Sequence, residues 1–195
     1  MATEEELLNC FSMPGGQSIT GRSSSIRNAF VAAIIPITKP SADEVESALR
    51  ILGLNPNDVR CAYCGDRATE WDHLRPLVSG GKPTGYPSSI RNLVPACGKC
   101  NQSKGKTDWK VWMCGKARLS PTARGISDVA HRVKRLEDYE RWASCTPLRI
   151  EELVDRSSWH KYYKLQKEIL DKMREAQEIA DSLGKQIRDR CSAGV

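Results

Sequence analysis

Four cysteines stand in two pairs of identical spacing. Cys61 and Cys64 form one Cys-x-x-Cys pair, and Cys97 and Cys100 form the other. Thiolates two residues apart can bind one tetrahedral ion together, and two such pairs complete the closed four-sulfur shell typical of structural zinc. The spacing therefore predicts a zinc ion that stabilises the fold and takes no part in a reaction.

Two other uses of these cysteines explain the pattern less well. Disulfides belong to oxidising compartments, and the start of the chain, MATEEELL, is too acidic and too short for a signal peptide. A thiol-redox role for Cys61 and Cys64 leaves the second pair without a purpose. The other four cysteines are scattered singly and are expected to be reduced thiols: Cys10, Cys114, Cys145 and Cys191.

Three polar residues lie between and just after the cysteine pairs. Asp72 and His73 are adjacent in ATEWDHLRPLV, which is predicted to contain a strand, and Asn101 directly follows Cys100 on a predicted short helix. If zinc draws the cysteine pairs together, it also brings Asn101 back toward Asp72 and His73. A histidine with an ordinary pKa of about 6.5 can accept a proton from water at neutral pH.

The order of these elements resembles that of a known family. Cys-x2-Cys, Asp-His-x-x-Pro, a Gly-rich loop, Asn-Leu and Cys-x2-Cys-Asn-x-x-Lys-Gly follow one another from Cys61 to Lys106. This pattern is similar to that of the HNH nucleases, whose core is a ββα-metal unit. Asn101 occupies the third signature position, at which the family's name has a histidine. An amide oxygen suits a hard cation, so magnesium is favoured over a transition metal, and manganese is an expected substitute.

The resemblance implies a role for each polar residue. His73 would be the catalytic base, Asp72 and Asn101 would hold one catalytic Mg²⁺, and Asn92 would fix the loop backbone that aims His73. Because adjacent strand residues face opposite sides, a bend or bulge is expected at Asp72 and His73. Basic residues near the site are expected to contact DNA phosphates, although a solvated basic face explains them equally well: Arg75, Lys99, Lys104 and Lys106.

The flanking sequence is predicted to be helical. The expected fold is therefore α+β, with helical regions at 1–56 and 117–195 around a zinc-stapled core at 57–116. Apolar periodicity predicts helices over 26–34 and 41–52 that pack together, preceded by a loop over 18–25. These helices are expected to support the core, while sequence readout by Arg22 and Arg27 is the alternative.

A long apolar stripe marks the C-terminal region. Residues three or four apart from Tyr162 to Ile187 predict one long helix with a seam like that of a coiled coil. Packing on the protein's own helices and pairing with a second copy are both compatible with it. His131 and His160 lie on predicted helices without clustered ligands and are assigned no chemistry.

The composition agrees with a polyanionic partner. Thirty Lys and Arg against 24 Asp and Glu give a net charge of +6, and no apolar run reaches the roughly 20 residues of a membrane helix. The expectation is a cytoplasmic, Mg-dependent DNA endonuclease, acting on its own in restriction or phage defence and binding double-stranded DNA. Homing or phage-encoded nucleases, and a non-catalytic zinc ribbon that binds nucleic acid, are the alternatives.

Overall fold

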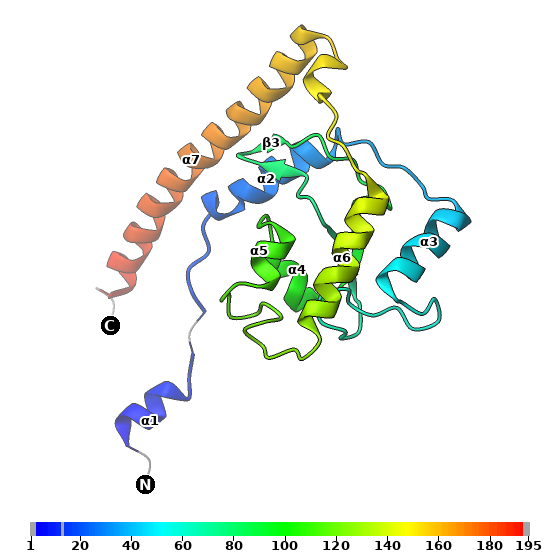
Figure 1. Cartoon of the computed structure of the whole chain (residues 1–195). Helices are drawn as coiled ribbons and strands as arrows, with labels where there is room; N and C mark the ends of the chain where they lie inside the picture. The colour runs from blue at the N-terminus through cyan, green and yellow to red at the C-terminus, as the bar shows by residue number, and fades with distance from the viewer. Residues whose placement is uncertain (1–2, 13, 193–195) are drawn as a thin grey trace. The chain divides into compact units, whose positions relative to one another are not determined.

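The computed structural model describes residues 3–12 and 14–192 of the 195-residue chain. These residues pack as two compact units, Met1–Ile26 with Lys161–Val195 and Arg27–His160. All the candidate site residues lie in the second unit. The fold is α+β, as predicted, with most of the regular structure in helices and two small antiparallel sheets (Figure 1). The three sequence regions, 1–56, 57–116 and 117–195, remain a prediction.

A two-stranded sheet and one helix form the centre of the second unit. Strand β1 (Glu70–His73) pairs antiparallel with β4 (Leu93–Ala96), and α4 (Gly98–Lys104) follows β4 directly and packs on β1. The chain between the strands contains the short hairpin of β2 (Val78–Ser79) and β3 (Lys82–Pro83). Its turn has two glycines at positive φ, a conformation in which other residues are strained. Strand, strand and helix in this order are the expected ββα unit.

Helix α3 (Ala42–Leu52) lies where the apolar periodicity predicts a helix, and both of its ends are capped. The Ser41 side chain accepts from the backbone N–H of Glu44, the Glu44 carboxylate accepts from that of Ser41, and Gly53 ends the helix at φ +64°. The expectation that this helix packs with the preceding one is wrong. Helix α3 packs on α6 (Val129–Ala143) and buries its apolar side chains in the central core.

The preceding helix, α2 (Ser23–Ala32), contributes to a different apolar cluster. Its Val31 is buried with Ile35 and Ile150. The separation follows from the connecting chain, because Thr38 donates its backbone N–H to the carbonyl of Ser88 and this extended segment carries α3 away from α2.

The loop expected over residues 18–25 is instead largely helical. A 3-10 turn at Thr20–Arg22 leads into α2 at Ser23. The Ser18 hydroxyl accepts from the backbone N–H of Gly21 at 2.9 Å, which satisfies a donor at the start of the turn.

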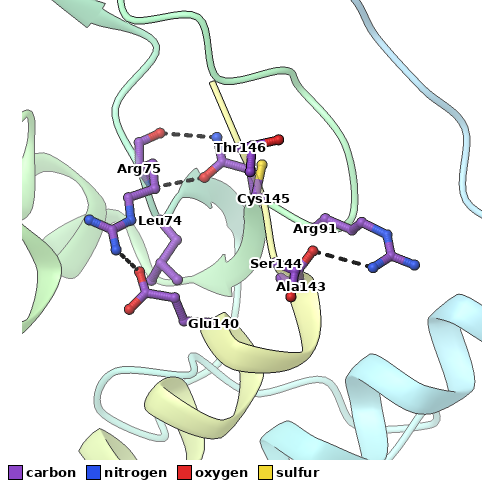
Figure 2. A pocket seen from close by; sticks show the side chains of 9 residues that line it. Leu74, Arg75, Arg91, Glu140, Ala143, Ser144, Cys145 and Thr146 are labelled. Carbon is purple, nitrogen blue, oxygen red and sulfur yellow. Dashed lines mark hydrogen bonds and ion pairs between the residues drawn. The ribbon is translucent and has the colours of Figure 1, made fainter. Parts of the chain in front are cut away.

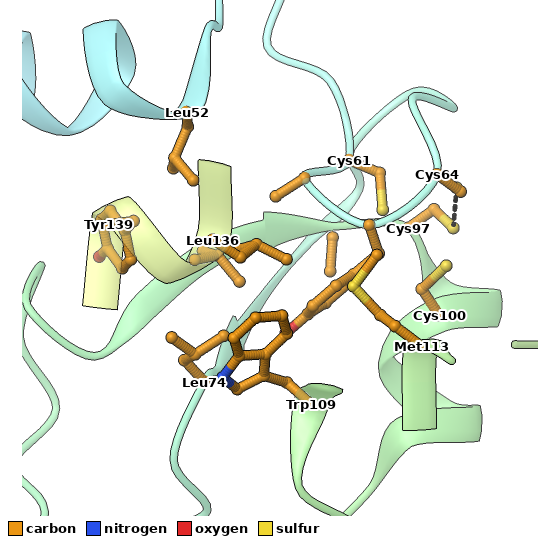
Figure 3. Close-up of a cluster of buried hydrophobic side chains, with 14 of the residues drawn as sticks. Leu52, Cys61, Cys64, Leu74, Cys97, Cys100, Trp109, Met113, Leu136 and Tyr139 are labelled. Atoms are coloured by element: carbon orange, nitrogen blue, oxygen red, sulfur yellow. Dashed lines mark hydrogen bonds between the residues drawn. The ribbon is translucent and has the colours of Figure 1, made fainter. Parts of the chain in front are cut away.

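The central core lies between residues 61–64, β4 and the helices α3, α4, α5 (Trp109–Met113) and α6. Trp109 and Trp112 of α5 are buried, as expected for core residues. They pack with Tyr63 and with Tyr139 of α6, and the Tyr139 hydroxyl donates to the carbonyl of Leu93 at 2.7 Å. Figure 3 shows this cluster continuing to Cys61, Cys64, Cys97 and Cys100, so the four paired cysteines pack as part of the core.

The other unit contains a short N-terminal helix, the 3-10 turn at Thr20–Arg22 and most of the long C-terminal helix. Helix α1 (Glu4–Asn9) begins at a capping box between Thr3 and Glu6. The long helix expected from the apolar stripe is α7, Arg156–Ser192. It follows a 3-10 turn at Ile150–Glu152, and its first residues, up to His160, belong to the second unit. None of the described helices is both long enough and apolar enough to cross a membrane.

Candidate functional site

The four paired cysteines converge on one point. Their sulfur atoms all lie within 4.8 Å of one another, and Sγ of Cys64 is 3.7 Å from Sγ of Cys97. Zinc–sulfur bonds of about 2.3 Å would place the corners of a tetrahedron about 3.8 Å apart. All four are buried free cysteines without disulfides. The cluster therefore fits a four-cysteine zinc site, and the disulfide alternative is wrong for these residues.

The sulfurs interact with one another and with a nearby cation. Hydrogen bonds from Cys100 and then from Cys64 lower the pKa of Cys61, and hydrogen bonds with Cys61 and Cys64 raise the pKa of Cys100. The Arg124 guanidinium lies 3.6 Å from Sγ of Cys100 and is held there by Asp66 at 2.7 Å. A cation beside the sulfurs offsets the negative charge that four thiolates bring to one divalent ion.

One face of β1 meets one face of α4. Residues two apart share a strand face and residues three apart share a helix face, so Glu70 and Asp72 lie opposite Asn101 and Lys104. The Nδ2 atom of Asn101 donates to Oε2 of Glu70 at 2.6 Å, and Nζ of Lys104 lies 2.9 Å from Oδ2 of Asp72. The structure thus brings Asn101 to Glu70, a residue that the sequence did not single out.

Asp72 is buried among its own partners. It is 5% exposed, and besides Lys104 it accepts a 2.5 Å hydrogen bond from the hydroxyl of Tyr63. Burial raises the pKa of Asp72, and the positive charge of Lys104 opposes that rise. The expected DNA contact of Lys104 is wrong, because its side chain has no exposed surface and its ammonium also donates to the carbonyl of His73 at 2.9 Å.

His73 faces away from these pairs. Its Nε2 atom lies 2.9 Å from the hydroxyl of Ser88, in the loop before β4. Of the bend or bulge expected at Asp72 and His73, the bulge is wrong, because β1 and β4 pair without an extra residue from Glu70 with Ala96 to His73 with Leu93. The chain bends directly after His73, at Leu74 and Arg75. Burial, and then the charge of Lys104, lowers the pKa of His73 to about 4, so the imidazole is neutral at pH 7.

Asn92 fixes the backbone that follows His73. It is fully buried, and its side chain accepts from the N–H of Arg75 at 2.8 Å and donates to the carbonyls of Arg75 at 3.0 Å and Pro87 at 3.3 Å. The Asn92 carbonyl also accepts from the N–H of Leu74 at 2.8 Å. An asparagine at this position therefore joins the end of β1 to the loop that contains Ser88.

The basic residues named from the sequence have different environments. Arg75 lines a cavity of about 260 Å³ beside Asn92, and Figure 2 shows its guanidinium directed toward Glu140. A second carboxylate, of Asp108, is 3.8 Å away, so the charge of Arg75 is largely compensated within the protein. Lys99 and Lys106 are exposed, and their contact with phosphate remains a prediction.

The oxygen donors beside α4 suit a hard divalent cation. Asp72 offers a carboxylate and Asn101 offers an amide oxygen, the ligand types that Mg²⁺ prefers. Asn101 and Glu70 are partly exposed, whereas the oxygens of Asp72 are already within reach of Lys104. The donor set fits the cation, and Lys104 competes with the cation for Asp72.

Three site neighbours were missed from the sequence. Glu70, Tyr63 and Ser88 contact Asn101, Asp72 and His73 respectively. The strand period gave a signal for Glu70 alone, because it stands two residues before Asp72 on the predicted strand. Nothing in the spacing indicated Ser88 or Tyr63.

Comparisons with known proteins match part of the chain to endonucleases. A sequence model of the HNH endonuclease family matches residues 61–107. A CRISPR-associated endonuclease Cas9 of Corynebacterium diphtheriae is 36% identical over 67 residues, which are 32% of this chain and 6% of that protein. A CRISPR-associated endonuclease Cas9 of Actinomyces naeslundii is 27% identical over 136 residues, which are 67% of this chain and 10% of that protein. No solved structure matches the chain significantly.

Proposed function

Because residues 61–107 form an HNH endonuclease domain with a four-cysteine cluster that fits zinc, we propose that this chain is a Mg-dependent endonuclease that hydrolyses phosphodiester bonds in double-stranded DNA. The observation that carries the proposal is the position of His73 at the end of β1, 2.9 Å from the Ser88 hydroxyl and on the strand against which α4 packs. Both relatives are named as endonucleases, which supports the reaction class.

His73 acts as the general base in this proposal. Its ring is neutral at pH 7, so Nε2 can accept a proton from the attacking water once that water takes the place of the Ser88 hydroxyl. Asn92 orients His73 by holding the backbone of Arg75, two residues later. Lys104 holds the carbonyl of His73 from the opposite side of the strand.

Asp72 and Asn101 would hold the catalytic Mg²⁺. When bound, the ion would neutralise the negative charge that grows on the phosphate and on the leaving oxygen. While no cation is bound, Lys104 keeps the buried carboxylate of Asp72 paired, since an unpaired buried charge is costly. The exposed ammonium groups of Lys99 and Lys106 supply contacts to phosphates that flank the scissile bond.

Cleavage by the purified, zinc-loaded chain tests the proposal. We expect duplex DNA to be cut when Mg²⁺ or Mn²⁺ is added and to stay intact in Ca²⁺ or without added divalent ion. Parallel reactions with single-stranded DNA and RNA define the substrate, and sequencing the ends defines the site and overhang. Binding of DNA without cutting in every divalent ion would contradict the proposal and favour the non-catalytic zinc ribbon.

A role in restriction or phage defence is the biological part of the proposal. It is supported by an HNH domain flanked on both sides by helical segments of one chain. Phage should form fewer plaques on cells that produce the chain than on cells that produce the His73→Ala variant. Transformation by unmodified plasmid should likewise be less efficient in the cells that produce the chain. Equal efficiencies in both strains would contradict this role while leaving the cleavage reaction untouched.

A further inference from the structure

The side chain of Asn101 has a defined orientation. An amide side chain has one oxygen and one nitrogen, and only the nitrogen can donate a hydrogen bond. An ionised carboxylate only accepts. The contact of 2.6 Å between Asn101 and Oε2 of Glu70 therefore requires the amide nitrogen to face Glu70. The reversed amide would place two acceptor oxygens against each other.

The same contact leaves the amide oxygen available. In a planar amide the oxygen and nitrogen lie on opposite branches, so a nitrogen directed at Glu70 turns Oδ1 away from this carboxylate. Both residues are partly exposed, and ions can reach them. A hard cation binds the oxygen of an amide, never its protonated nitrogen. Glu70 thus selects the one orientation in which Asn101 can be a ligand.

The backbone of α4 makes room for Glu70. A Cβ atom at position 98 would come within 3.0 Å of Oε1 of Glu70, and the residue at that position is glycine. Residues 98, 101 and 104 follow one another on the face of α4 that meets β1, so the space beside Gly98 lies on the same face as Asn101. A side chain at this position would crowd the Glu70 carboxylate by a few tenths of an ångström, and glycine avoids this.

We infer that Glu70 is a positioning residue that holds the amide of Asn101 with its oxygen turned toward the catalytic cation. This inference rests on the proposed function, because it concerns the same cation. Carboxylates behind a metal ligand orient that ligand, and their loss typically weakens metal binding by about 10-fold to 100-fold. Glu70 itself makes no bond to the cation in this arrangement.

Mn²⁺ binding, followed by the loss of the free-ion EPR signal, tests the inference without DNA. The full zinc-loaded chain is compared with Glu70→Ala, Glu70→Gln and the matched surface control Glu46→Ala, with zinc content and melting temperature measured for each. We expect Glu70→Ala to weaken Mn²⁺ binding by about 10-fold or more. Glu70→Gln keeps an acceptor oxygen for the Asn101 amide, so its affinity should stay within about 3-fold of wild type, as should that of Glu46→Ala.

Each contrary outcome has a separate meaning. Wild-type Mn²⁺ affinity in Glu70→Ala would overturn the inference, and it would leave the nuclease proposal standing if the wild-type chain cuts DNA. Glu70→Gln as weak as Glu70→Ala would also overturn it, because Glu70 would then act through its charge or as a ligand. A wild-type chain that neither binds Mn²⁺ nor cuts DNA would overturn both.

Discussion

The buried pair of Asp72 and Lys104 determines how the site behaves without its cation. Both side chains are almost fully buried, and their charges lie 2.9 Å apart. Breaking a buried pair by removing one partner leaves an uncompensated charge and typically costs about 3 to 5 kcal/mol. The pair therefore links the stability of the β1 and α4 region to its chemistry.

Replacing Lys104 with methionine should reveal this link. Lys104→Met keeps most of the apolar side-chain volume but leaves Asp72 without its cation, so we expect about 3 kcal/mol lower unfolding free energy in urea. Added Mg²⁺ should recover part of that loss, because it can now pair with Asp72 without competition, and it should stabilise the variant more than the wild type. The same Mg²⁺ dependence in both proteins would contradict a cation at Asp72.

The protonation of His73 can be measured directly. Its pKa of about 4 lies below the usual value near 6.5 because burial and then Lys104 disfavour the charged ring. A lowered histidine pKa means that the neutral, proton-accepting form persists as pH falls toward 4. The imidazole NMR resonance that disappears in His73→Gln should not titrate between pH 8 and 5.5. A midpoint near 6.5 would contradict the environment described for His73.

At the scale of elements, zinc bound by the four-cysteine cluster is expected to hold α4 against β1. Cys97 and Cys100 flank the start of α4, and the other two cysteines precede β1. Because metal binding is coupled to folding in such sites, Cys97→Ala or removal of zinc by a chelator should unfold the region around β1, β4 and α4. Native-like amide protection there after zinc loss would show that zinc is dispensable.

Arg124 offers a milder perturbation of the same site. Its guanidinium contacts Cys100 and pairs with Asp66. Arg124→Ala should release zinc to a chromogenic chelator several-fold faster, while Arg149→Ala, at an exposed arginine on the same chain, should not. Equal release rates in wild type and Arg124→Ala would remove Arg124 from the zinc site.

The sequence predicted the elements more fully than it predicted their contacts. The cysteine spacing, the capping box of α3 and the long apolar stripe each follow from local rules, and the structure agrees with them. The pairing of Asn101 with Glu70 depends on the register between β1 and α4, which is set by packing between segments that are far apart in the sequence. The burial of Lys104 could not be read from a basic residue that stands beside Gly105 and Lys106.

At the scale of the whole molecule, α7 leaves apolar side chains without cover. In the described chain, Ile179 is 57% exposed, Leu183 is 52% exposed and Ile187 is 61% exposed. We propose that a second copy covers this stripe, which would provide one site for each DNA strand. Sedimentation should show a dimer that Ile179→Glu combined with Leu183→Glu dissociates. A wild-type monomer at all concentrations would contradict the dimer.

The most direct test of the whole account is the single-turnover cleavage rate of duplex DNA by zinc-loaded wild type and His73→Ala in Mg²⁺. A general base typically contributes 10² to 10⁴ in rate, so we expect the variant to be at least about 100-fold slower. Its zinc content and melting temperature should match those of the wild type, because His73 belongs neither to the four-cysteine cluster nor to the central core. Cleavage at the wild-type rate by His73→Ala would contradict the account.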